Sequence, residues 1–107
     1  MSNSGNYIKN EAIREVASAS ITTSYAALGT PLQHRAYLIT VYNMTNGDVY
    51  LTKDIARNEK RFPAMSARLL DYKTDDAVEG KDVQYYLKWK AAPGAPSGDF
   101  WVEVEYV

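Results

Sequence analysis

The feature that most constrains the fold of this chain is an alternation of apolar and polar side chains with a period of two. In residues 99–106 one set of side chains is apolar or aromatic: Phe100, Val102, Val104 and Tyr106. The intervening set is mostly acidic: Trp101, Glu103 and Glu105. Because successive side chains of a strand point to opposite faces, this pattern predicts an antiparallel strand with one buried and one exposed face.

Residues 83–90 have the same period. Tyr85, Leu87 and Trp89 share one side, and the other side carries Tyr86, Lys88 and Lys90. Further runs rich in β-branched and aromatic residues predict strands at 19–25, 37–42, 48–52 and 62–72, although a helical turn over 66–72 is an alternative. The charged stretch 53–61 is interpreted as a connection.

A local signal suggests how two of these strands are joined. Asn46-Gly47 stands between the runs 37–42 and 48–52. Asn-Gly accepts the positive φ angles of a type I′ turn, whose twist matches that of two paired strands. The sequence therefore predicts a β-hairpin here.

The order of these elements indicates the fold class. Six or seven short strands are separated by turn-forming residues, and no strand–helix–strand rhythm is visible. With 107 residues, the chain has the size of one domain. We expect an all-β fold, a small antiparallel β-sandwich that is either jelly-roll-like or Ig-like.

The first residues differ in composition from the rest. Residues 1–12 contain only two large apolar side chains, Tyr7 and Ile8, and a short helix over 12–17 would follow them. We therefore expect an N-terminal arm, residues 1–17, in front of a sandwich domain, residues 18–107. Such an arm would order against a neighbouring subunit. Deleting residues 1–12 should then leave a folded sandwich that no longer assembles.

Composition argues against several classes of function. Twelve basic and 13 acidic residues give a net charge of −1, which disfavours both a nucleic-acid binder and a polybasic membrane anchor. Without cysteine, thiolate metal sites and cysteine nucleophiles are excluded. No apolar run reaches the roughly 20 residues of a membrane span, and no signal peptide is recognised, so synthesis in the cytoplasm is expected.

No set of residues predicts catalysis. His34 stands alone, without the Gly-x-Ser-x-Gly context of a nucleophile. Asp75-Asp76 lacks the pattern of a calcium loop, and Glu103 and Glu105 are neighbours on one strand face. Asn43-Met44-Thr45 matches a glycosylation sequon, which is attributed to chance. We expect no enzyme activity, no cofactor and no metal.

The aromatic residues favour contact with other molecules. Nine tyrosines and two tryptophans supply side chains that suit both half-buried sheet faces and interfaces. The candidate interface residues are Tyr7, Ile8, Ile13, Tyr86, Trp89 and Trp101. Two alternatives remain open for these aromatic residues, packing in the core between two sheets and a platform on which a sugar stacks.

Three segments carry a resemblance to a known class of protein. These are residues 21–32, the strand and turn at 37–49, and the aromatic strand, Pro/Gly-rich link and terminal strand at 88–106. Together they resemble small bacteriophage virion structural proteins of the head-decoration or head–tail accessory type. The resemblance implies a β-sandwich without catalytic residues, present in the virion in multiple copies and synthesised in the host cytoplasm.

The same resemblance implies partners. These would be other virion structural proteins, namely major capsid, portal or tail subunits, with homo-oligomer formation in the particle and no binding to nucleic acid or membrane. The alternative is a carbohydrate-binding or receptor-binding β-sandwich module of a tail fibre, with Tyr86, Trp89 or Trp101 as its stacking surface.

Overall fold

The computed structural model describes residues 9–56, 58–71 and 80–106, which form an almost entirely β structure. Its strands are β1 (Lys9–Asn10), β2 (Arg14–Ala17), β3 (Ala26–Ala27), β4 (Ala36–Asn43), β5 (Val49–Asp54), β6 (Asn58–Phe62), β7 (Ser66–Asp71), β8 (Tyr86–Trp89) and β9 (Asp99–Tyr106). A 3₁₀ turn, Ser18–Ser20, leads out of β2. The predicted all-β class is confirmed.

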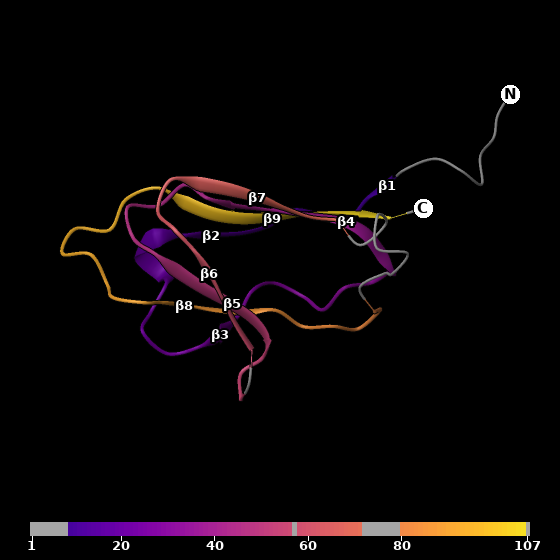
Figure 1. Ribbon diagram of the computed structural model, residues 1–107, viewed down its shortest axis with the longest axis horizontal. Coiled ribbons are helices and arrows are strands. Elements are labelled where there is room, and N and C mark those ends of the chain that lie inside the picture. Colours follow the sequence, from indigo (N-terminus) through magenta and orange to yellow (C-terminus); the bar gives the residue numbers. More distant parts are fainter. Residues whose placement is uncertain (1–8, 57, 72–79, 107) are drawn as a thin grey trace, which may run out of the picture.

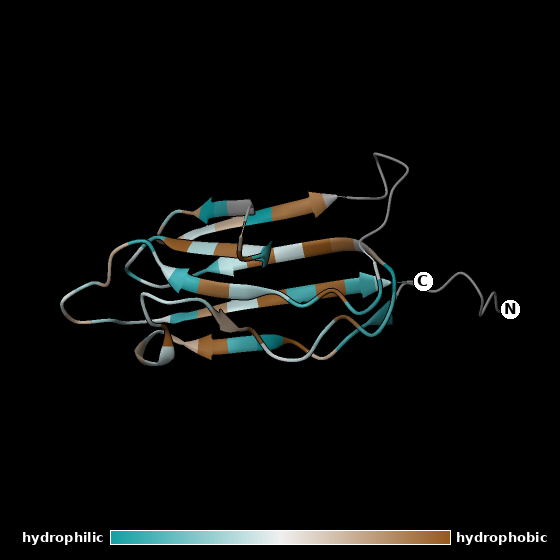
Figure 2. Ribbon diagram, turned by 90° about the horizontal axis from the view of Figure 1, so that it is seen from below, coloured by the Kyte–Doolittle hydropathy of each residue, from teal (hydrophilic) through white to brown (hydrophobic). Residues whose placement is uncertain are grey.

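The strands form two packed antiparallel sheets, which Figure 1 shows one above the other. Sheet A has the order β1-β9-β4-β7, with β2 also paired to β9. Sheet B has the order β3-β8-β5-β6. Along the strands, apolar and polar residues alternate, as Figure 2 shows. One face of each sheet is therefore buried in the sandwich and the other faces outward.

The pairing is nested. β5 pairs with β6, β4 with β7, β3 with β8 and β2 with β9, each antiparallel. The chain is thus one long hairpin, and it is wrapped so that β9 also pairs with β4 and β8 with β5. This order is that of a jelly roll, which decides between the two sandwich types expected from the sequence.

The predicted hairpin at Asn46-Gly47 is wrong. β4 lies in sheet A and β5 in sheet B, so the connection between them crosses from one sheet to the other. Among the described residues, positive φ angles occur at Gly29, Met65, Asp82 and Gly98, and therefore not at the two turn positions. Gly47 is required for space instead, because a Cβ there would lie 2.9 Å from the ring of Trp89.

A buried asparagine holds this crossing in place. The Asn43 amide donates to the carbonyl oxygens of Gly47 (3.0 Å), Phe62 (2.8 Å) and Pro63 (3.1 Å). Its side-chain oxygen accepts from the backbone N–H and the hydroxyl of Thr45. Asn43 and Thr45 are both 0 % exposed. The sequon residues therefore serve the packing of the fold.

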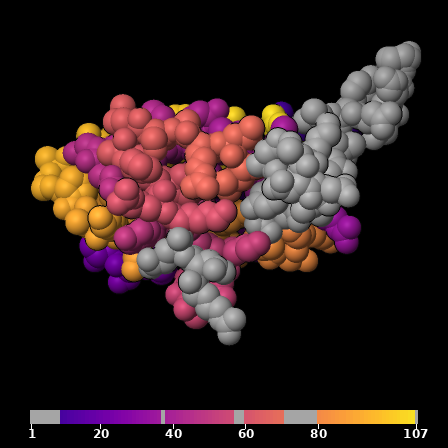
Figure 3. All heavy atoms as spheres, in the orientation of Figure 1, coloured from indigo at the N-terminus to yellow at the C-terminus, as the bar shows by residue number. Residues whose placement is uncertain are grey.

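The true hairpin is β5–β6. The charged stretch interpreted as a connection contains most of β6, which begins at Asn58, and the strand after it begins at Ser66. β7 is a strand throughout, so the alternative of a helical turn over 66–72 is wrong for residues 66–71. In Figure 3, residues of β6 and β7 form much of the visible face. Residues 19–25 also differ from expectation, because none of them lies in a strand; the short strand β3, Ala26–Ala27, follows them.

The N-terminal boundary differs from the one expected. Residues 1–8, with Tyr7 and Ile8, lie outside the described residues. Lys9–Asn10 and Arg14–Ala17, however, are strands of sheet A, and no helix forms over 12–17. The second half of the expected arm is therefore an edge of the sandwich. The pairing with β9 offers backbone hydrogen bonds that a free arm lacks.

The core lies between the sheets. It contains the set predicted for residues 83–90 and, of the set predicted for β9, all but Tyr106, which is only partly buried. With apolar residues of other segments, the core residues are Ile21, Leu28, Leu32, Ala36, Ile39, Val41, Val49, Leu51, Phe62, Leu70, Tyr85, Leu87, Trp89, Phe100, Val102 and Val104. Phe62 and Phe100 meet edge to face at its centre, with ring centroids 6.3 Å apart. The two sheets are thus joined by aromatic as well as aliphatic packing.

Candidate interaction surface

The outward face of sheet A combines acidic, aromatic and apolar side chains. Strand alternation and register place these residues on it: Asn10, Glu15, Ala17, Leu38, Thr40, Tyr42, Ala67, Leu69, Asp99, Trp101, Glu103 and Glu105. We call this set the sheet A face. It carries four carboxylates, and no lysine or arginine occupies any of its positions. A partner with positive charge would therefore complement it.

An aromatic pair lies within this face. Trp101 of β9 and Tyr42 of β4 are register neighbours, and their rings stack with centroids 4.8 Å apart and planes 16° from parallel. The indole Nε1 donates to Glu103 Oε2 at 3.3 Å. Both rings are half-buried. Such a pre-oriented pair offers a large contact area at low entropic cost, which is typical of interface anchors.

Exposed apolar side chains lie on sheet A or next to its strands. Leu69 of β7 is 52 % exposed, and Met65, just before β7, is 67 % exposed. On the other side of β9, Ile13 is 58 % exposed and borders a hollow of about 310 Å³ lined by Asn10, Glu103 and Glu105 as well. Leu69 shares the sheet A face with the aromatic pair, and an exposed apolar side chain on the same face as two aromatic rings favours a binding surface.

The predicted interface residues are divided by the structure. Trp101 and Ile13 lie on or beside the sheet A face. Trp89 is 2 % exposed, so it belongs to the core and offers no surface to a partner or a sugar. Tyr86 faces outward from sheet B, on the opposite side of the sandwich. Tyr42 was not predicted, because its place beside Trp101 depends on the register between β4 and β9, which the sequence pattern alone does not contain.

The outward side of sheet B carries cations beside tyrosine rings. Strand register places Tyr86, Lys88, Tyr50 and Arg61 there. The Lys88 ammonium lies 4.6 Å from the ring centroid of Tyr25 and 5.7 Å from that of Tyr50. We call these five residues the sheet B face. Thr52 is the register neighbour of Tyr86, but it is 3 % exposed and therefore buried.

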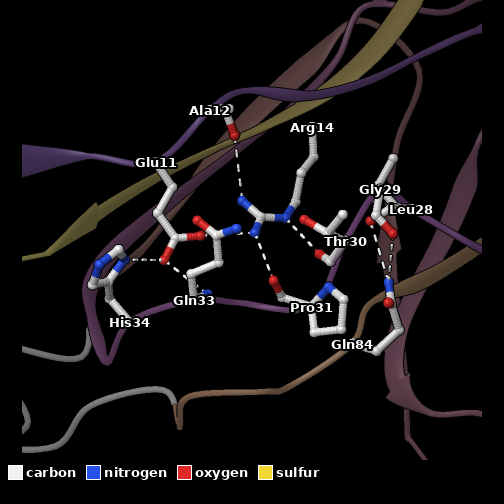
Figure 4. Close-up of polar contacts among 10 residues, drawn as sticks. All are labelled: Glu11, Ala12, Arg14, Leu28, Gly29, Thr30, Pro31, Gln33, His34 and Gln84. Atoms are coloured by element: carbon white, nitrogen blue, oxygen red, sulfur yellow. Dashed lines mark hydrogen bonds and ion pairs between the residues drawn. The ribbon is translucent and has the colours of Figure 1, made fainter.

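A buried ionic cluster fastens the edge of sheet A. The Glu11 side chain is 1 % exposed, and Figure 4 shows it between Arg14 and His34. Glu11 Oε1 accepts from Arg14 Nη2 at 2.7 Å, and Oε2 accepts from the Gln33 N–H at 3.0 Å and contacts His34 Nδ1 at 2.9 Å. No sequence pattern pointed to this cluster, because its members are separated by up to 23 residues.

Arg14 links the cluster to the chain that precedes β4. Its Nε donates to the carbonyl of Thr30 at 2.8 Å, and its Nη2 donates to that of Pro31 at 2.9 Å. His34 stacks on Tyr106, with ring centroids 3.6 Å apart. Glu11 and Arg14 therefore connect the N-terminal edge of sheet A to residues 30–34. His34 in turn connects these residues to β9.

These contacts determine the ionisation of Glu11. Burial alone would raise the pKa of its carboxyl, because it penalises the charged form. The hydrogen bonds from His34, Arg14 and the Gln33 backbone, together with the charge of Arg14, outweigh burial and hold this pKa below its usual value. Because both carboxylate oxygens already have hydrogen-bond partners, the role of the cluster is to stabilise the fold.

Two further observations limit the kinds of site in the described residues. No group of three or more His, Asp or Glu side chains is placed to hold a metal ion within the described part of the chain. Across the same residues, no helix has the length and apolar character to cross a membrane.

Comparisons of the chain with protein-family models, with curated proteins and with solved structures found no match.

Proposed function

We propose that the chain is a non-enzymatic structural subunit of a bacteriophage virion, which binds neighbouring protein subunits through the sheet A face. The observation that carries the protein-binding part is the stacked Trp101–Tyr42 pair among exposed apolar and acidic side chains. Aromatic anchors surrounded by polar groups are the usual composition of protein interfaces. The phage identity is supported by the resemblance of residues 21–32, 37–49 and 88–106.

The jelly-roll order is compatible with this proposal. Viral capsid subunits are among the proteins built on this fold, although lectin domains share it, so the fold alone decides nothing about function. A jelly roll presents two broad sheet faces on a rigid body. A subunit that attaches to a particle needs a surface of this kind, held in one shape before binding.

The test is incorporation into particles. Virions are purified from cells that encode the chain, and the chain is detected in them by mass spectrometry and located by immunogold labelling. We expect label on the head or the head–tail junction. Particles that are complete and contain no copies would contradict the virion role.

A pair of matched variants tests the surface. Leu69→Ser changes an exposed apolar residue of the sheet A face, and Ile55→Ser changes one of similar exposure, 58 %, at the β5–β6 turn. Both variants should fold, but only Leu69→Ser should reduce incorporation. Equal incorporation of the two would exclude the sheet A face as the contact surface.

One observation favours a second candidate, a carbohydrate-binding or receptor-binding module. A half-buried Trp101 beside the carboxylate of Glu103 provides both a stacking plane and a hydrogen-bond acceptor for hydroxyl groups. Glycan-array binding that disappears in a folded Trp101→Ala variant would favour this function. The candidate surface is then the same, but the ligand is a sugar.

A further inference from the structure

Trp101 stands among carboxylates on the sheet A face. The strand register places Glu15 beside it on β2, and Asp99 and Glu103 precede and follow it on the same side of β9. Its neighbour on β4 is Tyr42, which stacks on the indole ring. The indole is therefore bordered by a tyrosine ring on one side and by acidic residues on the other three.

These carboxylates have almost no partners within the protein. In the described part of the chain, the side chains of Glu15, Asp99 and Glu105 take part in no hydrogen bond or ion pair. Glu103 has only its 3.3 Å hydrogen bond from the indole N–H. Because the positions of the sheet A face hold no lysine or arginine, no cation of the face balances this charge. A cation from another molecule complements it.

The orientation of the rings favours a planar cation. Tyr42 covers one face of the indole, since the two rings are 4.8 Å apart and 16° from parallel. β9 lies between β4 and β2, so the other indole face is turned away from Tyr42, towards the side that carries Glu15. A guanidinium can stack on this face while its edge donates hydrogen bonds to a carboxylate. The ammonium of lysine is a compact, strongly hydrated charge and gains less from such a site.

A hollow farther along β9 provides room for a second basic side chain. Its volume is about 310 Å³, and Ile13, Glu103 and Glu105 are among the residues that line it. Ile13 is 58 % exposed, so it can cover the aliphatic stem of an arginine or a lysine whose charged end reaches Glu105. The acidic and aromatic contacts thus continue beyond Trp101 along the same strand.

We propose that the subunit bound by the sheet A face presents an arginine-rich surface, with one guanidinium stacked on Trp101 between Glu15 and Glu103. A second basic side chain of the same subunit occupies the hollow beside Ile13 and Glu105. The inference rests on the proposed function, because it names the chemistry of the partner that this surface binds. Charge accelerates the encounter of the two proteins, and the stacked guanidinium is the central anchor of the contact.

The experiment is a titration of the isotope-labelled full chain, followed through the indole N–H signals in proton–nitrogen NMR spectra. The chain has two tryptophans, and Trp89, which is 2 % exposed in the core, is the internal reference for Trp101. The probe is a short peptide of alternating glycine and arginine. Two matched peptides carry lysine, or the uncharged arginine analogue citrulline, in place of arginine.

The arginine peptide should shift the Trp101 signal and leave that of Trp89 in place. It should bind at least about threefold more tightly than the lysine peptide and more weakly as salt is added, whereas the citrulline peptide should show no measurable binding. Because two exposed charge pairs are lost, Glu15→Gln/Glu103→Gln should weaken binding at least about threefold. Asp82→Asn is the matched control, because it neutralises an exposed carboxylate outside the sheet A face at a positive φ that asparagine accepts. It should match wild type.

Several results would overturn the proposal. They are equal binding of the arginine and citrulline peptides, a Trp101 signal that the arginine peptide does not shift, and a double variant that binds as wild type does. Maltohexaose that shifts Trp101 where the arginine peptide does not would also overturn it, in favour of a sugar ligand. The comparison of peptides uses the wild-type chain alone, so it decides the question even if the double variant does not fold.

Incorporation into particles separates this inference from the proposed function. A Glu15→Gln/Glu103→Gln chain that enters particles as fully as wild type, while Leu69→Ser does not, would reject the arginine-rich partner and leave the proposed function standing. An arginine peptide that binds at Trp101, although virions contain no copies of the chain, would support the chemistry of the partner and reject the virion role.

Discussion

Replacing Arg14 by methionine tests whether the Glu11 cluster holds the edge of sheet A. The change keeps most of the aliphatic stem and removes the guanidinium, which is the cationic partner of a carboxylate that is 1 % exposed. It also leaves the carbonyl groups of Thr30 and Pro31 without their donor. Removing one partner of a buried ion pair costs about 3–5 kcal/mol, because the remaining charge stays buried; here Glu11 keeps only the Gln33 N–H and His34 as partners. We expect a loss of that size.

Two further variants separate the interaction energy of the Glu11–Arg14 pair from the contributions of the two individual side chains. Glu11→Leu should cost a similar amount, because it leaves a buried guanidinium. The double variant Glu11→Leu/Arg14→Met buries no charge, so it should lose less than the sum of the two single losses by about 2 kcal/mol or more. Urea unfolding followed by circular dichroism measures each free energy, with the slope against urea concentration as a check on two-state behaviour. A loss below about 1 kcal/mol for Arg14→Met, or additive losses, would refute the reasoning.

Acid provides an independent readout of the same cluster. The pKa of Glu11 is lowered in the folded state from its ordinary value of 4.5, because the bonds and charge around it outweigh its burial. Its ionised form therefore contributes stability above pH 4.5, and this contribution is lost as the pH falls through the lowered value. The stability gap between wild type and Glu11→Gln should accordingly narrow from pH 6 towards pH 2. A gap independent of pH would contradict this account.

Three further changes have defined outcomes. Asn43→Ala removes five hydrogen bonds of a buried side chain at the β4–β5 crossing and should lower the free energy of unfolding by about 3 kcal/mol or more, measured by urea unfolding. Gly98→Ala places a Cβ 1.9 Å from a backbone oxygen at φ +83°, whereas the Gly94→Ala control meets nothing within 4 Å, so only the former should lower the melting temperature markedly. Deleting residues 1–13 should lower the urea midpoint more than deleting residues 1–8, because the longer deletion removes β1 and Glu11; equal midpoints would contradict the role of this edge.

The fold class was predictable because it depends on local alternation. The inward and outward sets of β8 and β9 follow from side-chain period alone, which is a property of neighbouring residues. The β4–β5 connection was not predictable in the same way. Asn46-Gly47 has the composition of a tight turn, but whether two strands pair or separate depends on what packs against them, here Asn43 and the ring of Trp89.

Only part of the candidate surface could be predicted from the sequence, again because it depends on tertiary packing. Trp101 was identified from its strand, but its partner Tyr42 depends on the register between β4 and β9. The Glu11 cluster depends on three segments that are distant in sequence. Trp89 shows the converse problem, since an aromatic residue on a strand suits either the core or an interface until the opposite sheet is placed. Residue type limits an aromatic side chain to the core or an interface, and the tertiary packing determines which of the two it occupies.

The pairing of β2 with β9, which encloses β3 to β8 in the sequence, has a kinetic consequence. Nearly all of the stabilising pairs join distant parts of the chain, so folding must close large loops before most contacts form, and a rate in the slow range for small domains follows. β9 supplies Trp101 and Glu103, so the sheet A face does not exist in any intermediate in which this strand is undocked. Only a chain that has completed its fold therefore presents the surface through which we propose that it assembles, so partly folded chains do not bind the partner subunits.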